Sequence, residues 1–183
     1  YQGSTTVSAG NSEQSGYLTV VDSDSNIQNF IDFHSKDGQL ELPSDGGALI
    51  NIGLAQDLEL EVGDSFSIRG DDTGVMTFTV SGIFDNYIYN YVYITTETYT
   101  SISGAEPEIN TAFLTVPDNV DQSSAAALLL GMDNVINVSE SNVMRDRIGS
   151  MMDSLIYIVL LTIVCAAALA FIVIYNLTNI NIT

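Results

Sequence analysis

Basic side chains are scarce in this chain of 183 residues, which holds four Lys and Arg against 23 Asp and Glu. The formal net charge is -19, and every charged residue lies at or before Asp153. Nucleic acids and anionic headgroups are polyanions and repel a domain this acidic. The sequence therefore excludes DNA and RNA as partners. Solubility is the favoured explanation of the acidity, with a salt-adapted organism or a cationic partner as alternatives.

Cysteine and histidine are nearly absent. Cys165 is the one cysteine and lies in an apolar run, so an intrachain disulfide and a cysteine-based metal site are excluded. His34 is the one histidine, and packing at the end of a helical stripe explains it. The sequence has no nucleophile elbow, phosphate-binding glycine loop or His/Cys metal spacing. We therefore expect a non-catalytic protein without a cofactor.

One segment begins like a calcium-binding loop, Asp22-Ser23-Asp24-Ser25-Asn26. It lacks the Gly required at the sixth position, which is Ile27, and the Glu required at the twelfth, which is Phe33. Capping of a helix over residues 27–34 also explains Asp, Ser and Asn at these positions. The capping interpretation is favoured over calcium, and no metal site is predicted.

The strongest single signal is an uncharged run of 21 residues, Leu155–Tyr175, without Pro or Gly. As a helix it would be roughly 31 Å long, which matches a hydrocarbon core of about 30 Å. Tyr157 and Tyr175 lie near its ends, where rings suit the headgroup region. Ala166 and Ala170 share one face and would let a neighbouring helix approach, although Ala also simply tolerates lipid. A transmembrane helix is predicted in preference to a buried soluble helix.

The orientation of this helix is ambiguous from charge. Arg145 and Arg147 precede it and no basic residue follows it, which by the positive-inside rule places the N-terminal side in the cytoplasm. The four basic residues in the first 150 nevertheless suit a translocated domain. Because the chain begins at Tyr1, we interpret it as a piece of a longer protein, whose missing residues could decide the orientation.

Before the membrane segment, the pattern predicts mixed helices and strands. Residues 1–16 are small and polar and are expected to be a flexible lead-in. Period-two alternation over residues 65–81 predicts an antiparallel hairpin, with a bulge or bend at Gly82. The other expected strands are 17–21, 40–42, 48–51, 91–95, 110–116 and 135–138, and the expected helices are 27–34, 54–60, 96–102 and 120–132.

A further helix is expected from Ser141, running without a breaker into the membrane. Its apolar residues recur at helical spacing and would form a stalk stripe. The stripe consists of Val143, Met144, Ile148, Met151 and Met152. This pattern predicts a continuous rod between the outer domain and the bilayer.

Tyrosines alternate along the segment IFDNYIYNYVYIT, at Tyr87, Tyr89, Tyr91 and Tyr93. Alternation places them on one strand face, where amphipathic rings could contact a partner or ligand. Tyrosine is also common in strands for structural reasons, and that interpretation is favoured.

The order of these blocks resembles the FtsX-like permease family over residues 17–182. The matching pieces are ALINIGLAQDLELEVGDSFSIRG, TFTVSGIFDNY, YVYIT, NTAFLTV and the exit IYNLTNINI. They look most like the extracytoplasmic domain of MacB-type ABC transporter permeases. The resemblance implies an α+β, two-lobed ectodomain: a β-α-β, ferredoxin-like lobe (17–42 and 107–140), with an inserted mostly-β lobe (43–106). A stalk (141–154), a transmembrane helix (155–175) and the start of a cytoplasmic segment (176–183) would follow.

The resemblance also implies a function. It predicts a multi-pass protein of the cell membrane with residues 1–154 outside, coupled to a cytoplasmic ABC ATPase that moves its helices. Expected contacts are membrane lipid and other helices of the permease or a dimer partner. The ectodomain of a single-pass sensor or surface-binding protein is the alternative, and a secreted enzyme comes third.

Overall fold

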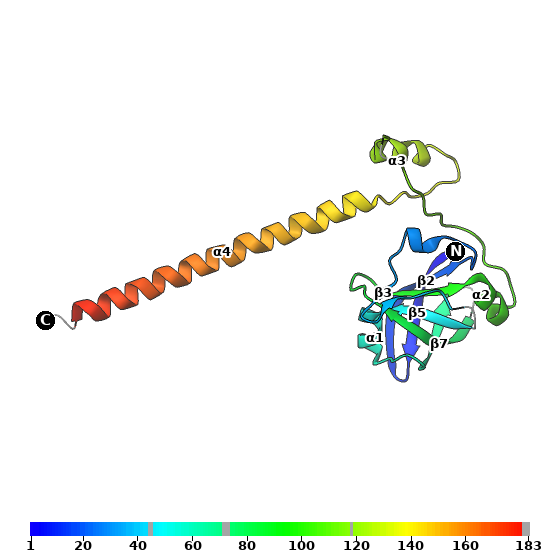
Figure 1. Ribbon diagram of the computed structural model, residues 1–183, viewed down its shortest axis with the longest axis horizontal. Coiled ribbons are helices and arrows are strands. Elements are labelled where there is room, and N and C mark those ends of the chain that lie inside the picture. The colour runs from blue at the N-terminus through cyan, green and yellow to red at the C-terminus, as the bar shows by residue number, and fades with distance from the viewer. Residues whose placement is uncertain (44–45, 71–73, 118, 181–183) are drawn as a thin grey trace. The chain divides into compact units, whose positions relative to one another are not determined.

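The computed structural model describes residues 1–183 except 44–45, 71–73, 118 and 181–183. The chain divides into two compact units, Tyr1–Phe113 and Leu114–Thr183. The first unit holds the strands and the second holds the longest helix, and Figure 1 labels the elements of both. Each unit is described by itself.

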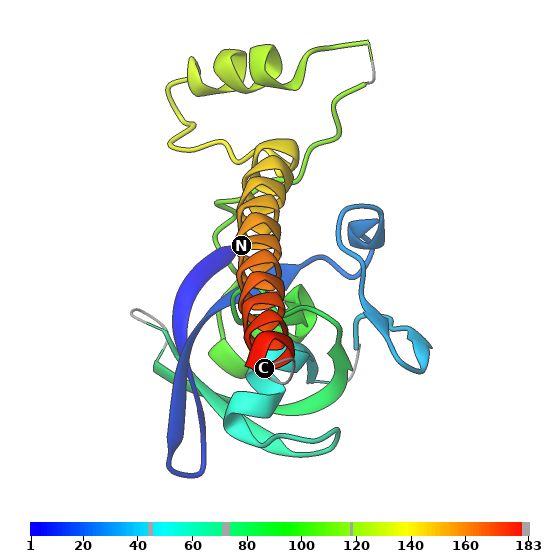
Figure 2. The same ribbon diagram turned by 90° about the vertical axis from the view of Figure 1, so that its left-hand side faces the viewer.

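Six strands of the first unit form a closed barrel, in the order β1-β2-β8-β5-β7-β6, and β6 pairs back to β1. They are β1 (Gln2–Ala9), β2 (Ser12–Val21), β5 (Gly47–Asn51), β6 (Ser65–Gly70), β7 (Gly74–Phe84) and β8 (Tyr91–Thr95). The β2–β8 and β5–β7 pairs are parallel, and the other four pairs are antiparallel. Figure 2 shows β1 and β2 as a long curved hairpin in dark blue.

Alternating side chains fill the barrel. Phe66 and Ile68 of β6 are buried, as are Met76, Phe78 and Val80 of β7, while their neighbours face outward. The predicted hairpin is therefore confirmed. So is the bulge before Gly82, because the partners of β5 pass from Val80 directly to Gly82 and leave Ser81 unmatched.

A second apolar cluster lies outside the barrel, and residues 27–42 cover it. Its buried members are Val21, Ile27, Phe33, Leu49, Phe84 and Tyr93. The covering segment contains η1 (Ile27–Asn29), β3 (His34–Ser35) and β4 (Gly38–Gln39). The ring of Phe33 lies 4.9 Å from that of Tyr93. Both faces of β5 are consequently buried, which explains why all five of its residues are enclosed.

Two short helices complete the barrel unit. α1 (Ile52–Leu58) places Leu54, Ala55 and Leu58 in the barrel core, and α2 (Thr96–Ser103) adds Tyr99. The turn after α1 places Gly63 at φ 99°, a conformation that favours glycine. There, the Asp64 carboxylate accepts the Glu61 N–H at 2.8 Å. The expected strand, helix and turn order of this block is confirmed.

The second unit contains α3 (Gln122–Leu130) and α4 (Ser141–Ile180). The Asp121 carboxylate caps α3 by accepting the Ser124 N–H at 2.9 Å and its hydroxyl at 2.7 Å. α4 is continuous over 40 residues, or roughly 60 Å at the usual rise. The helix expected from Ser141 is confirmed.

The expected flexible lead-in over residues 1–16 is wrong, because these residues form β1 and most of β2. Their inward side chains are small, such as Thr5 and Val7, and their outward ones are polar. The hydrophobic alternation of a strand is therefore weak in the sequence. β2 also joins β8, so one barrel holds residues from both expected lobes, 17–42 and 43–106.

Four other local expectations differ from the structure. The helix over 27–34 is reduced to η1, and the strand over 40–42 is replaced by the β3–β4 pair. Residues 110–116 and 135–138 form no strand in the described chain, and α3 has no strand on either side. A strand needs a hydrogen-bonded neighbour, and Ile136, at 97% exposure, packs against nothing that would supply one. The β-α-β arrangement of residues 107–140 is therefore not formed.

Candidate functional sites: the membrane helix, the strap and the tyrosine face

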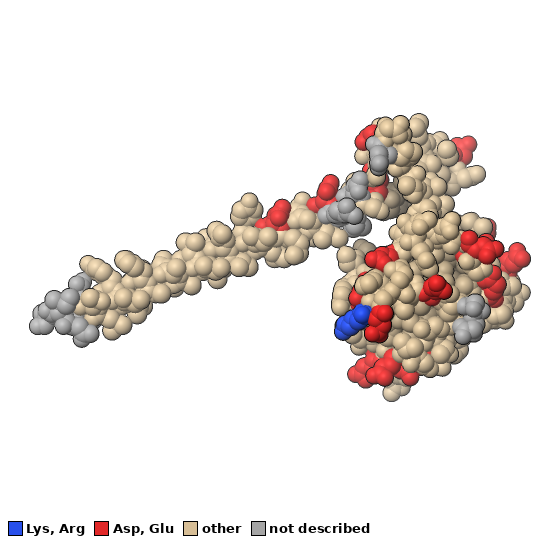
Figure 3. All heavy atoms as spheres, viewed as in Figure 1, with Lys and Arg blue, Asp and Glu red and all other residues tan. Residues whose placement is uncertain are grey.

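Within the described chain, α4 has one segment long and apolar enough to cross a membrane, Ile148–Thr178. No part of its most apolar stretch is buried by protein. Its last charged residue is Asp153, and Figure 3 shows the rest of the described helix free of charged side chains. The acidic side chains lie on the barrel unit, around α3 and on the first part of α4. The predicted span Leu155–Tyr175 lies inside this segment.

Hydroxyl groups along α4 bond back to the helix itself. The Thr162 hydroxyl, which lies inside the span, donates to the Ile158 carbonyl at 2.9 Å. Ser154 and Thr178, outside it, do the same to the carbonyls four residues earlier. Because lipid offers no hydrogen-bond partners, a hydroxyl satisfied within its own helix suits a hydrocarbon environment.

The predicted stalk and packing residues lie on α4. Val143, Ile148, Met151 and Met152 are exposed, while the side chain of Met144 lies outside the described residues. Ala166 and Ala170 are four residues apart on α4 and are also exposed. Their roles in force transmission and helix packing stay predictions.

A segment that we call the strap, Gly104–Phe113, follows α2 and ends the barrel unit. The side-chain amide of Asn110 bonds both backbone groups of Gln2, each at 2.8 Å. The ring of Phe113 lies 6.1 Å from that of Phe30. Between the strap and β2 lies a cavity of about 450 Å³. The strap is thus fastened to the barrel at two points.

The structure separates the four predicted tyrosines. Tyr91 and Tyr93 lie on the outer face of β8 and their rings stack at 5.9 Å, but Tyr93 is 4% exposed and belongs to the outer cluster. Tyr87 and Tyr89 precede the strand, in a loop, and are 71% and 60% exposed. The expected alternation along one strand therefore holds for Tyr91 and Tyr93 and not for Tyr87 and Tyr89.

Tyr17, which sequence reasoning missed, joins this group from β2. Its ring lies 5.6 Å from that of Tyr91 and 6.3 Å, edge-on, from that of Tyr89. Burial raises the pKa of Tyr91, and the neighbouring Tyr17 and Tyr89 add to the effect. Burial raises the pKa of Tyr93 further. Tyr91 and Tyr93 thus keep their hydroxyl protons at neutral pH.

Asn51 fixes the loop that carries Tyr89, and sequence reasoning missed this residue as well. It is fully buried, and its amide donates to the carbonyls of Asn86 and Tyr89 at 2.9 and 3.0 Å. Its Oδ1 accepts the Tyr91 N–H at 2.8 Å. Tyr89 itself adopts φ 57°, an unusual conformation that these bonds hold in place. The sequence feature that could have indicated this role is the position of Asn51, a polar residue at the end of an apolar strand.

The Asp22–Asn26 segment is a turn that bonds to itself and to α2. The Asp22 carboxylate accepts the Asp24 N–H at 3.2 Å, and the Ser23 hydroxyl donates to Glu97 at 2.7 Å. That bond holds the Glu97 pKa below its ordinary value. Asn26 makes no side-chain cap to η1, so the capping interpretation is wrong. Among the described residues, no group of three or more His, Cys, Asp and Glu is placed to hold a metal.

No curated protein matches the chain. Among solved structures, the chain is similar to the extracellular domain of the noncanonic ABC-type transporter YknZ from Gram-positive bacteria. The identity is 14% and the TM-score 0.46, over 57% of this chain and 56% of that one, so this chain spans little more than half of that solved domain.

A family model described as the MacB-like periplasmic core domain matches residues 1–131, which cover the barrel, the strap and α3. The match includes most of the chain and leaves α4 outside it. The chain therefore belongs to the family of MacB-like periplasmic core domains, as its resemblance to MacB-type ABC transporter permeases predicted.

Proposed function

We propose that this chain is the part of an ABC transporter permease that carries movement of a membrane helix to an extracytoplasmic barrel. A cytoplasmic ATPase moves the helices of the permease, and α4 acts as a lever. The barrel then carries out the function of the protein outside the membrane. The observation that carries the proposal is the continuity of α4, which has no break between Ser141 and Ile180. A helix without a kink transmits a displacement at one end to the other.

The periplasmic family supports an extracytoplasmic barrel, against the orientation that Arg145 and Arg147 suggest by charge. A multi-pass permease fits this family better than a single-pass sensor does. In the multi-pass form, Ala166 and Ala170 would meet another helix of the permease or of a dimer partner.

The strap would receive the movement at the barrel. Residues 114–140 link α4 to Phe113, so any pull along the chain from α4 reaches the strap before it reaches a strand. The Asn110 bonds to Gln2 then connect the strap to the first residue of β1. Because β1 pairs with both β2 and β6, a pull there acts on the barrel wall.

The test uses the full-length permease with its ATPase in lipid vesicles. Ile148→Pro should break α4 in the middle of the stalk, since proline removes a helix hydrogen bond and clashes with the preceding turn. Ile148→Ala is the matched control, because it removes the same side chain and keeps the helix. We expect Ile148→Pro to change ATP turnover severalfold and Ile148→Ala to leave it near wild type.

Equal ATP turnover in the two variants, with both inserted in the membrane at equal levels, would contradict the lever. Hydrogen exchange of the barrel amides provides the folding control. Those amides should be equally protected in both variants, so that a loss of coupling is not confused with unfolding.

A further inference from the structure

The outer surface of β6, β1, β2 and β8 carries two parallel rows of side chains. In the first row, Arg69 pairs with Thr6 and Thr6 pairs with Ser15 across neighbouring strands. In the second row, Ser4 pairs with Tyr17 and Tyr17 pairs with Tyr91. These residues alternate with buried ones such as Val7, Leu18 and Ile68, so their side chains face away from the core.

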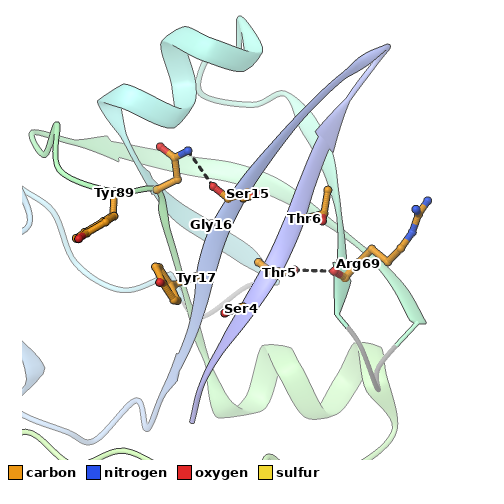
Figure 4. A pocket seen from close by; sticks show the side chains of 9 residues that line it. Ser4, Thr5, Thr6, Ser15, Gly16, Tyr17, Arg69 and Tyr89 are labelled. Carbon is orange, nitrogen blue, oxygen red and sulfur yellow. Dashed lines mark hydrogen bonds between the residues drawn. The ribbon is translucent and has the colours of Figure 1, made fainter. Parts of the chain in front are cut away.

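A cavity of about 400 Å³ lies over these rows, and Figure 4 shows the residues that line it. We call its lining the hydroxyl–tyrosine face. It consists of Ser4, Thr5, Thr6, Ser15, Gly16, Tyr17, Arg69, Tyr89 and Asn90. In a chain of net charge -19, none of these nine residues is acidic. The face therefore differs in chemistry from the rest of the acidic barrel.

Hydrogen bonds hold the loop side of this cavity against β2. The Asn90 amide donates to the Ser15 carbonyl at 3.0 Å, and the Asn90 carbonyl accepts the Tyr17 N–H at 2.8 Å. Gly16 makes the close approach possible, because a Cβ there would lie 3.0 Å from the Asn90 carbonyl oxygen. The Tyr89 and Tyr17 rings are consequently positioned before any ligand arrives, which lowers the entropic cost of binding.

The chemistry of this face matches a sugar ring. A pyranose has an apolar C–H face, which an aromatic ring covers, and a rim of hydroxyl groups that donate and accept hydrogen bonds. Tyr17 and Tyr89 offer the rings. Ser4, Thr6 and Ser15 offer hydroxyls that both donate and accept. Arg69 adds the one formal charge of the face, which is positive.

A peptide strand fits the same region less well. Peptides often bind by adding a strand to a sheet edge, where unpaired backbone N–H and C=O groups are free to form hydrogen bonds. At this face β8 pairs with β2 only from Tyr17 onward, but the Tyr17 N–H and the Ser15 carbonyl are already bonded to Asn90, so little of a free strand edge remains. Recognition here must come from side chains, which favours a ligand rich in hydroxyl groups.

We propose that the hydroxyl–tyrosine face is a carbohydrate-binding site that takes a short segment of glycan, with Tyr89 stacking on one sugar, Tyr17 beside it and Arg69 at one end. The ligand source is the glycan of the extracytoplasmic space. A carboxylate on the sugar would strengthen binding through Arg69. This inference concerns what the barrel touches and does not depend on transmission along α4.

The test is a titration of the full chain in detergent micelles, followed by amide NMR shifts of β1, β2 and residues 85–91. The probes are a tetramer of N-acetylglucosamine, which is neutral, and a tetramer of galacturonic acid, which carries carboxylates. We expect saturable shifts at the face with either probe. Tyr89→Ala should weaken binding about tenfold, because it removes a stacking ring. Tyr87→Ala is the control, since Tyr87 lies in the same loop but does not line the cavity.

Arg69→Gln distinguishes the two kinds of glycan. Relative to the wild type, weaker binding of the galacturonate tetramer alone would support a carboxylated ligand, and unchanged binding of both probes would support a neutral one. Absence of saturable shifts with both probes would overturn the proposal. So would an equal loss of affinity in Tyr89→Ala and Tyr87→Ala, because the cavity would then have no special part in binding.

Discussion

The side-chain amide of Asn110 bonds both backbone groups of Gln2: the Gln2 N–H donates to Oδ1, and Nδ2 donates to the Gln2 carbonyl. These two bonds are those that a residue of a neighbouring strand would make with Gln2, although the strap is not a strand. It fastens the strap at the residue where β1 begins. Asn110 is therefore the most direct polar link between the barrel wall and the segment leading to α4.

Replacement of Asn110 tests this link. Asn110→Ala should raise the hydrogen-exchange rate of the Gln2 amide about thirtyfold, because two hydrogen bonds that each contribute about 1 kcal/mol are lost. Glu108→Ala, an exposed change in the same strap, should leave that rate unaltered. Exchange followed by NMR measures both. An unchanged Gln2 amide in Asn110→Ala would show that the strap is held by other contacts.

Asn51 should be critical for stability. Asn51→Ala removes three hydrogen bonds of a fully buried side chain, so we expect the free energy of unfolding to fall by about 2–4 kcal/mol. Asn86→Ala, in a half-buried residue whose side chain accepts one N–H bond, should cost less than half as much. Urea unfolding followed by tyrosine fluorescence measures both variants. Similar losses in the two would contradict the central role of Asn51.

Gly82 allows close packing at the bulge. A Cβ there would lie 2.9 Å from Leu49 Cδ2 and 3.1 Å from Leu40 Cδ1. Gly82→Val should therefore lower stability by about 1–3 kcal/mol through overpacking. Ser81→Val enlarges the neighbouring side chain, which faces solvent, and should change stability by less than about 0.5 kcal/mol. If the two substitutions cost the same in urea unfolding, overpacking is not the cause.

The cap of α3 should depend on pH. The Ser124 hydroxyl and N–H lower the pKa of Asp121 below its ordinary value of 3.8. The cap therefore contributes stability above the unfolded pKa, and this contribution is lost as pH falls through the lower folded value. The Ser124 amide shift should titrate at acidic pH in the wild type and stay flat in Asp121→Asn, which caps without titrating. A flat wild-type curve would refute the cap.

Insertion of α4 should fail with a charge near its middle. Val164→Arg places a guanidinium in hydrocarbon at a cost of about 2.5–3.5 kcal/mol, whereas Val164→Leu is neutral. We expect a smaller carbonate-resistant membrane fraction for the arginine variant alone. If both variants stay equally membrane-bound, residues 155–175 do not form the span by themselves.

Local patterns predicted the elements whose partners are near in sequence. The hairpin of β6 and β7 shows its alternation directly, and α4 shows its length and lack of charge. β1 was missed although its partner β2 follows it directly, because Thr5 and Val7 are its buried residues and its other partner, β6, lies some sixty residues away. The strands expected over 110–116 and 135–138 have the right composition and no neighbour to bond.

The residues of the candidate sites also divide into those that a local sequence pattern predicted and those that it did not. Tyrosine alternation drew attention to the right segment, but it could not reveal that Tyr89 leaves the strand with positive φ or that Tyr17 joins it from β2. The first depends on the bonds of Asn51 to the loop, and the second on the pairing of β2 with the distant β8. From the sequence, a single polar residue at the end of a strand does not predict three buried hydrogen bonds.

Closure of the barrel also sets an order for folding. β1 and β2 come first in this chain, yet β1 needs β6 and β2 needs β8 before the ring is complete. Most of these contacts are distant in sequence, so the loop entropy of closing the ring must be overcome before the pairing stabilises it. A domain that crosses a membrane N-terminus first would thus expose an unfinished sheet until Tyr91–Thr95 had emerged, and a chaperone that shields β1 and β2 during that interval would raise its yield.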